Sequence, residues 1–382
     1  MRERRLKLLS LITCCLLPAA GGARAQEPPA AQPGETAAAE ASTPEDGGGL
    51  KISIHGYLSQ AYAQSDGTQF LGITKDGTAD YRTAAVQIRA DVTRHDAFAV
   101  QLSHERFGNS PIQTQFDDVD LDWIFYEHRF GDATTVKVGK VQTPYGIYNE
   151  VRDVGTLLPF YRPSHNFYAD GAFSTETIDG IVVSHRFTFG SWGLDGDLHY
   201  GNWEFLNKTN IGTYVTRRVD DSLGAQLWVQ TPLPGLRIGG GRMDFQVQPV
   251  TATQKQQDWD MSYFSLDSQL GRVVLQAEYR KVDVVTSKVS GGYVHLGVGI
   301  TGKLSLHGQY DDMDLKLKTT RLKLDMDHDV AAGLKYDFTP AHVLKAEYHW
   351  NETAFWAENV VPAILGPTRK TEYWLLSFAT SF

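Results

Sequence analysis

The C-terminal stretch EYWLLSFATSF, from Glu372 to Phe382, alternates between two kinds of position along the chain. Successive side chains of an extended strand point to opposite faces, so every second residue shares a face. One face of this stretch carries Trp374, Leu376, Phe378, Thr380 and Phe382. About ten residues of strand cross a bilayer when the strand is tilted. The stretch therefore predicts a membrane-spanning β-strand that ends on an aromatic residue.

The same alternation recurs from Leu50 to the C-terminus, and counting the segments gives about sixteen strands. The clearest lipid-facing stripes are expected at Val119, Leu121, Trp123 and Phe125, at Trp192, Leu194, Leu198 and Tyr200, at Leu304, Leu306 and Tyr310, and at Val330, Ala332, Leu334, Tyr336 and Phe338. The mean hydropathy of −0.30 is too polar for a bundle of membrane helices. We therefore predict an all-β, antiparallel, up-and-down transmembrane barrel over residues 50–382.

Short and long links alternate between these segments. Short links are expected at residues 94–96, 131–133, 190, 232–235, 271, 301–303 and 339–341. Long links are expected at residues 64–80, 107–117, 142–175, 202–220, 247–258, 283–290, 312–327 and 351–370. Outer-membrane barrels have tight periplasmic turns and longer external loops. The alternation therefore predicts that both termini lie on the periplasmic side.

The N-terminal residues differ from the rest. Residues 1–25 have the pattern of a secretory signal peptide, with a basic start, an apolar run at residues 8–20 and small residues at Ala23 and Ala25. Both cysteines, Cys14 and Cys15, lie in this segment, so the mature chain would contain no thiol. Residues 26–49 are rich in Ala, Pro, Glu and Gly, a composition that predicts a disordered periplasmic tether. Without residues 1–25 the chain has 31 basic and 44 acidic residues, which disfavours nucleic acid as a partner.

Other classes of protein fit the sequence less well. A soluble β-sandwich or β-helix also alternates, but it has no reason to place aromatic residues near the ends of so many apolar stripes. We expect no enzyme activity, because the chain has no Gly-x-Ser-x-Gly or His-Glu-x-x-His motif. Scattered histidines such as His55, His104, His128 and His199 lack the spacing of a metal site, and we expect neither metal nor cofactor. A non-conducting adhesin or structural barrel stays open as the alternative to a pore.

Two motifs resemble those of the porin superfamily of Gram-negative outer membranes. The last strand, with Trp374, Phe378 and Phe382, is similar to the signal that the barrel-assembly machinery recognises. The stretch GKVQTPYG at residues 139–146 is similar to the one that leads porins into their third external loop. The resemblance implies a sixteen-stranded homotrimer in the outer membrane, in contact with lipid and lipopolysaccharide, that lets small hydrophilic solutes and ions diffuse passively. It also implies that the third loop folds into the lumen as a constriction.

The longest predicted link, residues 142–175, supplies the candidate constriction. We expect the charges of Arg152, Asp153, Arg162 and Asp170 to shape the field there and Tyr161 to limit the width. Loops of this length are usually functional. The alternative is an external, solvated loop. The acidic Pro-Glu-Phe-Gly-Gly signature of general porins is absent, so no constriction residue is carried over from them.

The polar face of the predicted strands supplies the lumen wall. The candidates singled out are Arg89, Asp118, Asp120, Asp122 and Lys137. Over all predicted strands, ten positions on this face are acidic, Glu105 and Glu278 among them. Five positions are basic: Arg89, Lys137, Arg280, Lys335 and Lys345. The excess of acidic positions indicates a weak cation preference. Asp118, Asp120 and Asp122 would point the same way, about 7 Å apart, and could attract a cation. A hydrated stripe paired with neighbouring bases is at least as compatible with this pattern. A substrate-selective pore for anions or carboxylates also stays open.

Overall fold

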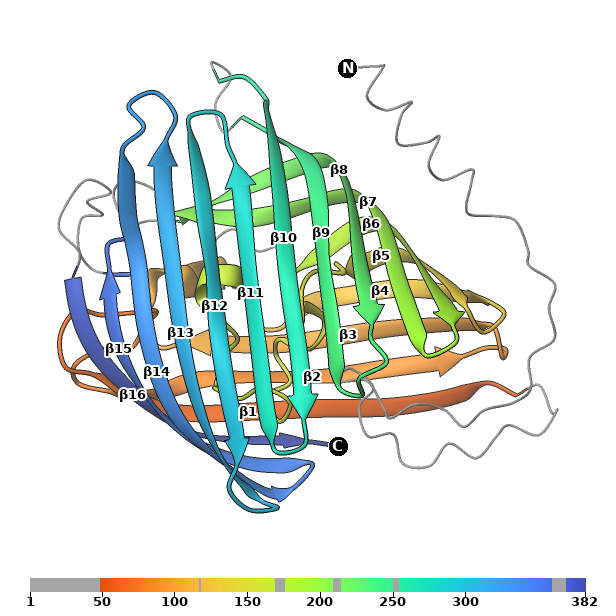
Figure 1. Cartoon of the computed structure of the whole chain (residues 1–382), viewed down its shortest axis with the longest axis horizontal. Coiled ribbons are helices and arrows are strands. Elements are labelled where there is room, and N and C mark those ends of the chain that lie inside the picture. The colour runs from red at the N-terminus through yellow and green to blue at the C-terminus, as the bar shows by residue number, and fades with distance from the viewer. Residues whose placement is uncertain (1–48, 117, 169–175, 209–213, 250–253, 359–368) are drawn as a thin grey trace. The chain divides into compact units, whose positions relative to one another are not determined.

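The computed structural model describes residues 49–116, 118–168, 176–208, 214–249, 254–358 and 369–382. These residues form one closed antiparallel barrel in which each strand pairs with its neighbours in sequence and β16 pairs with β1 (Figure 1). The expected number of sixteen strands and the up-and-down order are confirmed. The predicted signal peptide and nearly all of the predicted tether lie outside the described residues.

The strands vary from nine to seventeen residues in length. Their bounds are β1 (Lys51–Ser65), β2 (Thr78–Asp91), β3 (Asp96–Phe107), β4 (Asp120–Phe130), β5 (Thr134–Gln142), β6 (Thr177–Phe189), β7 (Trp192–Lys208), β8 (Tyr214–Gln230), β9 (Leu236–Val247), β10 (Gln257–Leu270), β11 (Val273–Asp283), β12 (Ser287–Gly299), β13 (Leu304–Leu317), β14 (Lys323–Thr339), β15 (His342–Thr353) and β16 (Arg369–Ser381).

Helical structure in the described residues is limited to three short pieces. They are η1 (Pro111–Gln115) between β3 and β4, and η2 (Asn149–Val151) and α2 (His165–Tyr168) between β5 and β6. Among these residues there is no helix of the length and apolar character that crossing a membrane requires.

The two faces of the barrel differ as the alternation predicts. On β16, Trp374 and Phe378 are exposed on the apolar outer face, whereas Tyr373 and Ser377 are buried on the polar inner face. The same division holds for the predicted stripes on β7, β13 and β14, as Leu334 on β14 illustrates with 49% of its surface exposed. Period-two alternation was therefore a reliable guide to the face on which a side chain lies.

The predicted stripe on β4 is wrong in its second half. Leu121 is exposed on the outer face, as expected, but Trp123 and Phe125 are each only 7% exposed and lie on the polar face. The cause is a β-bulge: Leu121 pairs with Leu102 and Trp123 pairs with Gln101, so Asp122 is an extra residue that the backbone register with β3 skips. A bulge inserts one residue and reverses the alternation beyond it. The outer face continues through residue 124 instead.

The seven short links lie close to the predicted positions, but strands occupy more than half of three of the predicted long links. Residues 202–220, 283–290 and 312–327 were predicted as loops, whereas strands occupy residues 202–208 and 214–220 of the first range, 283 and 287–290 of the second, and 312–317 and 323–327 of the third. Paired strands satisfy their backbone N–H and C=O groups. Register shifts, such as the one between Gly201 and Trp203 on β7, allow the ladder to continue where the alternation is interrupted.

The barrel closes where β1 meets β16. This ladder runs from Tyr57 opposite Ser381 to Ser65 opposite Tyr373. Beyond it, the N–H of Phe382 donates to the carbonyl of Gly56 at 3.0 Å, and the N–H of Gly56 donates to the carbonyl of Phe382 at 3.1 Å. The last residue of the chain is therefore part of the seam.

Deletion of Phe382 should destabilise the barrel through the loss of these two backbone hydrogen bonds, at about 1 kcal/mol each. Phe382→Ala keeps both bonds and removes only an exposed ring, so its urea unfolding midpoint after refolding into lipid vesicles should lie between those of the wild type and the deletion variant. Equal midpoints for the two variants would show that the side chain, and not the backbone pairing, stabilises the seam.

Candidate functional site

The connection between β5 and β6 contacts strands that are not its neighbours in the barrel. The N–H of Gly146 donates to Gln226 on β8 at 2.9 Å, and the N–H of Ile147 donates to Glu278 on β11 at 3.0 Å. Further along, the N–H of Tyr161 donates to Glu347 on β15 at 2.8 Å. Its described parts, residues 143–168 and Glu176, therefore pack against the polar face of strands far from β5 and β6.

The first turn of this connection depends on the predicted motif at residues 139–146. Gly146 has a φ of +65°, a conformation that favours glycine. A Cβ atom at this position would lie 2.6 Å from Oε1 of Glu278 and 2.7 Å from the hydroxyl of Tyr168. Tyr145 stacks on Phe167, with ring centroids 4.9 Å apart and an interplanar angle of 6°. The motif therefore brings the two ends of the connection together against β11.

Buried charged groups on β14 and β15 hold the middle of the connection. Lys345 is 1% exposed and donates to the carbonyls of Gly155 and Phe160 at 2.9 and 2.5 Å. Lys335 donates to the carbonyl of Thr156 at 2.9 Å. Sequence reasoning counted both lysines among the lumen charges. It missed their use as anchors, because only the fold brings the backbone of the connection to them.

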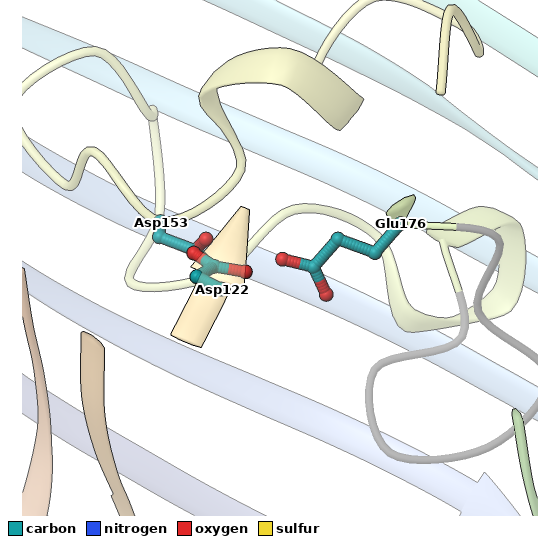
Figure 2. A group of neighbouring side chains, drawn as sticks. All are labelled: Asp122, Asp153 and Glu176. Carbon is teal, nitrogen blue, oxygen red and sulfur yellow. The ribbon is translucent and has the colours of Figure 1, made fainter. Parts of the chain in front are cut away.

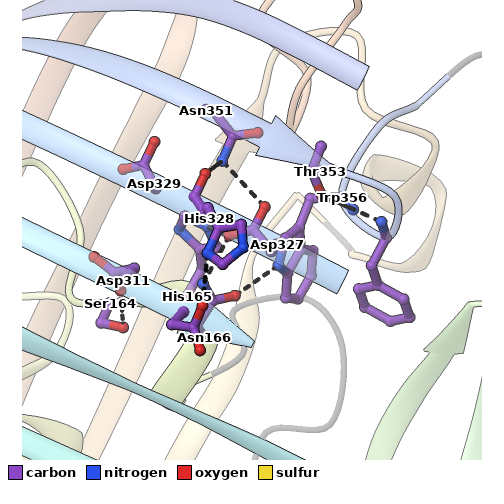
Figure 3. Close-up of polar contacts among 12 residues, drawn as sticks. Ser164, His165, Asn166, Asp311, Asp327, His328, Asp329, Asn351, Thr353 and Trp356 are labelled. Carbon is purple, nitrogen blue, oxygen red and sulfur yellow. Dashed lines mark hydrogen bonds and ion pairs between the residues drawn. The ribbon is translucent and has the colours of Figure 1, made fainter. Parts of the chain in front are cut away.

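The short helix α2 is held by a group of polar side chains on β13 and β14 (Figure 3). Ser164 donates to Asp311, and the amide of Asn166 donates to Asp327 at 2.7 Å. The Nε2 atom of His165 lies 3.3 Å from Asp327. The sequence analysis did not single out Asp327 or Asn166. Neither belongs to a recognisable motif.

Electrostatics favour the charged form of His165. Burial on its own would lower the pKa of this imidazole, but the hydrogen bond and charge of Asp327, together with the charge of Asp311, raise the pKa to about 9. At neutral pH the ring is therefore protonated and forms an ion pair with Asp327. Phe70 and Trp356 contact the same ring edge-on, with centroids 5.2 and 5.5 Å from it.

Asp153 of the connection lies close to Asp122 of β4 and to Glu176 (Figure 2). Carboxylate oxygens of Asp122, Asp153 and Glu176 approach within 4.8 Å of one another. The Nε atom of Arg152 lies 3.9 Å from Glu176. Burial raises the pKa of Asp153 well above its usual range, and the charges of Glu176, Glu105 and Asp122 raise it further. Carboxylates are ligands for hard cations, but here Arg152 already supplies positive charge beside them.

Arg162 and Tyr161 lie among aromatic side chains. The guanidinium carbon of Arg162 is 3.9 Å from the ring centroid of Phe107 and 5.2 Å from that of Tyr81. Cation–π attraction stabilises such an arrangement. Tyr161 is 4% exposed and contacts Tyr81 at a centroid distance of 5.3 Å. Of the five predicted constriction residues, the structure thus brings four to the side of β1–β4, whereas Asp170 lies outside the described residues.

The predicted wall residues do not form one group. Arg89 donates to Asp91 at 2.9 Å and to Glu127 at 2.7 Å. The ammonium of Lys137 lies 5.2 Å from the ring centroid of Phe125. The three carboxylates predicted to point the same way lie in different environments. Asp118 precedes β4, Asp120 is its first residue, and Asp122 is the bulged residue that accepts a hydrogen bond from Gln101.

No protein-family model matches the chain, and no curated protein matches its sequence. Solved structures do match. The trimer form of OmpT, an outer membrane protein of Vibrio cholerae, gives a TM-score of 0.56 at 14% identity over 87% of this chain and 99% of that one. Salmonella typhi OmpF in complex with daunomycin gives 0.60 at 11% identity over 87% and 97%. The anion-selective porin from Comamonas acidovorans gives 0.54 at 12% identity over 87% and 100%.

The chain has the porin fold. At these identities the likeness concerns the fold alone. It confirms the fold that the last strand and residues 139–146 led us to expect. The described side chains that contact the β5–β6 connection come from at least nine strands: β2, β3, β8, β10, β11, β12, β13, β14 and β15.

Gly146→Ala should destabilise the protein more than Gly271→Ala. Both glycines have a similar positive φ, +65° and +63°, so either substitution costs about 1–2 kcal/mol for the left-handed backbone. A Cβ atom at Gly271 meets nothing within 4 Å, whereas one at Gly146 clashes with Glu278 and Tyr168. Urea unfolding midpoints, together with hydrogen exchange of residues 145–168, measure the difference. Equal losses would mean that the connection does not pack on β11 as described.

Proposed function

We propose that this protein is an outer-membrane porin that lets small hydrophilic solutes and ions diffuse passively, with a weak preference for cations. The observation that supports the proposal most directly is a closed sixteen-stranded barrel that combines an apolar outer face with a polar inner face. A barrel of this size encloses more space than the side chains of its wall can fill. Passive diffusion needs such a space and no catalytic group.

The outer face supports a location in the lipid bilayer. Its exposed side chains are largely apolar in the middle of the strands, and aromatic pairs lie towards strand ends, such as Tyr336 with Phe338 at 4.9 Å and Tyr62 with Trp374 at 5.4 Å. Aromatic girdles at both interfaces are typical of outer-membrane barrels. The proposal includes residues 1–25 as a signal peptide, residues 26–49 as a periplasmic tether, and periplasmic termini.

The β5–β6 connection supports a constriction. Its contacts with β8, β11 and β15 are best explained if it crosses the lumen, because these strands lie away from β5 and β6 in the closed barrel. We propose that Arg152, Asp153, Arg162 and Asp170 shape the field at the narrowest point and that Tyr161 limits its width.

The charge cluster beside this constriction supports a preference for cations. Four carboxylates, from Glu105, Asp122, Asp153 and Glu176, interact there with two guanidinium groups, from Arg152 and Arg162. Glu176 has 34% of its side chain exposed, so water can reach its carboxylate. This exposed carboxylate of Glu176 is therefore the group that attracts a mobile cation more strongly than an anion at this point. The alternative, selectivity for anions or carboxylates, would need exposed bases in excess.

One observation favours a second candidate, a non-conducting adhesin or structural barrel. Apolar side chains from three further connections, including Phe70, Ile112 and Trp356, form one buried cluster with Tyr161 and Met313. Such packing narrows the space inside the barrel. Single-channel recording in a planar bilayer separates the two functions: stepwise, salt-dependent currents support the porin, and their absence supports the adhesin.

The partners follow from the same proposal. OmpT, which this chain resembles in fold, is described in a trimer form, and we propose a homotrimer here as well. Lipid and lipopolysaccharide would cover the outer face. The last strand, with Trp374, Phe378 and Phe382, would be read by the barrel-assembly machinery.

Glu176→Gln should shift the reversal potential in a salt gradient towards anions. At about 10 Å in water one unit charge contributes about 0.4 kcal/mol, so we expect the cation-to-anion permeability ratio to fall by about two- to fourfold. Asp132→Asn, in the exposed β4–β5 turn, is the matched control and should leave the ratio unchanged. An unchanged ratio in Glu176→Gln would place this carboxylate outside the conduction path.

Leu227→Arg should destabilise the protein if the outer face contacts lipid. Leu227 is 46% exposed on the outer face of β8, and an arginine near the middle of a bilayer costs about 2–4 kcal/mol. Gln230→Arg, on the polar face of the same strand and beside Asp195, is the control and should cost little. Unfolding in lipid vesicles measures both. Equal effects would argue against a bilayer around β8.

A further inference from the structure

Two histidines on neighbouring strands share one hydrogen bond on the polar face of the barrel. The Nε2 atom of His295 on β12 lies 3.0 Å from the Nδ1 atom of His307 on β13. The ring centroids are 5.2 Å apart, and the ring planes differ by 13°. Each centroid lies about 1.1 Å from its nitrogen, so these values place the two rings end to end in nearly one plane. In that arrangement the lone pair of one nitrogen meets the N–H of the other.

The neighbours of the pair determine which nitrogens carry protons. The amide of Gln276 donates to Asp267 at 3.0 Å, so its Oε1 atom faces the other way, where it accepts from the hydroxyl of Tyr148. The Nδ1 atom of His295 lies 3.1 Å from this oxygen and must be the donor. In a neutral pair, Nε2 of His295 is then the acceptor for Nδ1–H of His307. The remaining nitrogen, Nε2 of His307, accepts from Ser305 at 2.8 Å.

The pair contacts the proposed constriction through Phe160. The ring centroid of Phe160 lies 6.0 Å from that of His295 and 6.2 Å from that of His307, both edge-on. His349 contacts the same ring at 5.9 Å. Phe160 is 2% exposed, and its carbonyl accepts from Lys345. A Cβ atom on Gly333 would lie 2.8 Å from this ring, so Phe160 packs directly against the backbone of β14.

We infer that the His295–His307 pair is a positioning element that holds the ring of Phe160 in place only while both histidines are neutral. Acid therefore weakens the packing of the β5–β6 connection against the barrel wall. The inference rests on the proposed function in that it takes this connection to be the constriction. A first added proton charges the pair beside two lysines. A second places two N–H groups face to face and breaks the hydrogen bond between the rings.

The charged groups around the two histidines determine how protonation of the pair affects the connection. The charged groups that face it are Asp267 on β10, Lys335 on β14 and Lys345 on β15. Across Phe160, His349 pairs with Asp329 at 2.7 Å. Both lysines are already used to hold the backbone of the connection, so repulsion from a charged pair acts directly on its anchors. Burial and the two lysines disfavour the charged form of the pair, so the expected change lies in acid, between about pH 6 and pH 3.5.

Hydrogen exchange of residues 156–162 in the full chain, refolded in detergent and corrected for the intrinsic pH dependence, tests the inference. Between about pH 6 and pH 3.5 we expect the protection factors of these amides to fall by about tenfold, which corresponds to a shift of one pKa unit. The double variant His295→Gln and His307→Gln should lose this dependence on pH. His199→Gln is the control and should keep it, because His199 is a buried histidine on β7 with no hydrogen-bond partner among the described residues.

Two further outcomes complete the test. Gly333→Ala should displace Phe160 and give low protection of residues 156–162 at both pH values. Single-channel conductance recorded on the same proteins should change with pH in the wild type and in His199→Gln but not in the double variant. Protection that is equal at both pH values in the wild type would overturn this inference even if the protein conducts. A protein that does not conduct but keeps the pH effect on exchange would overturn the proposed function alone.

Discussion

Every backbone N–H and C=O group that lies in hydrocarbon needs a partner inside the protein, because lipid offers none. In this chain the ladder between β1 and β16 meets that need by closing the sheet, and the pairing of Gly56 with Phe382 extends it to the last residue. Closure makes one face of every strand an outer face and the other an inner face. The apolar alternation, the strand lengths and the enclosed interior all depend on this pairing.

We propose that the β5–β6 connection packs inside the space that the barrel encloses. Sixteen strands surround more space than their own side chains fill, and in the proposed pore the connection supplies aromatic rings and backbone carbonyls that occupy part of it. Buried charges on the wall serve this packing. Lys345 holds two carbonyls of the connection and Glu347 holds one N–H. Such charges cost free energy when they are buried without partners, so their pairing with the connection is part of what stabilises it.

Because some wall charges hold the connection, the number of acidic and basic positions on the wall does not by itself predict the ion preference. Lys335 and Lys345 were counted as bases that face a wide lumen, yet both donate hydrogen bonds to backbone carbonyls of the β5–β6 connection. The carboxylates at Asp122 and Glu176, in contrast, gather around Arg152 and Asp153 at one point. In the proposed pore, selectivity would therefore depend on a few neighbouring groups and their exposure, and the composition of the inner face is a weak guide to it.

The sequence alone determined the barrel, because each strand must alternate to have one apolar and one polar face, and that pattern is local. It also located the connection and the motif that begins it, since Gly139 and Gly146 mark backbone conformations that other residues rarely adopt. Only the tertiary structure decided which face Trp123 occupies, because the bulge at Asp122 depends on pairing with β3. It likewise decided the neighbours of Phe160, Asp327 and the His295–His307 pair, since these contacts join strands and a connection that are far apart in sequence, and no local pattern records such distances.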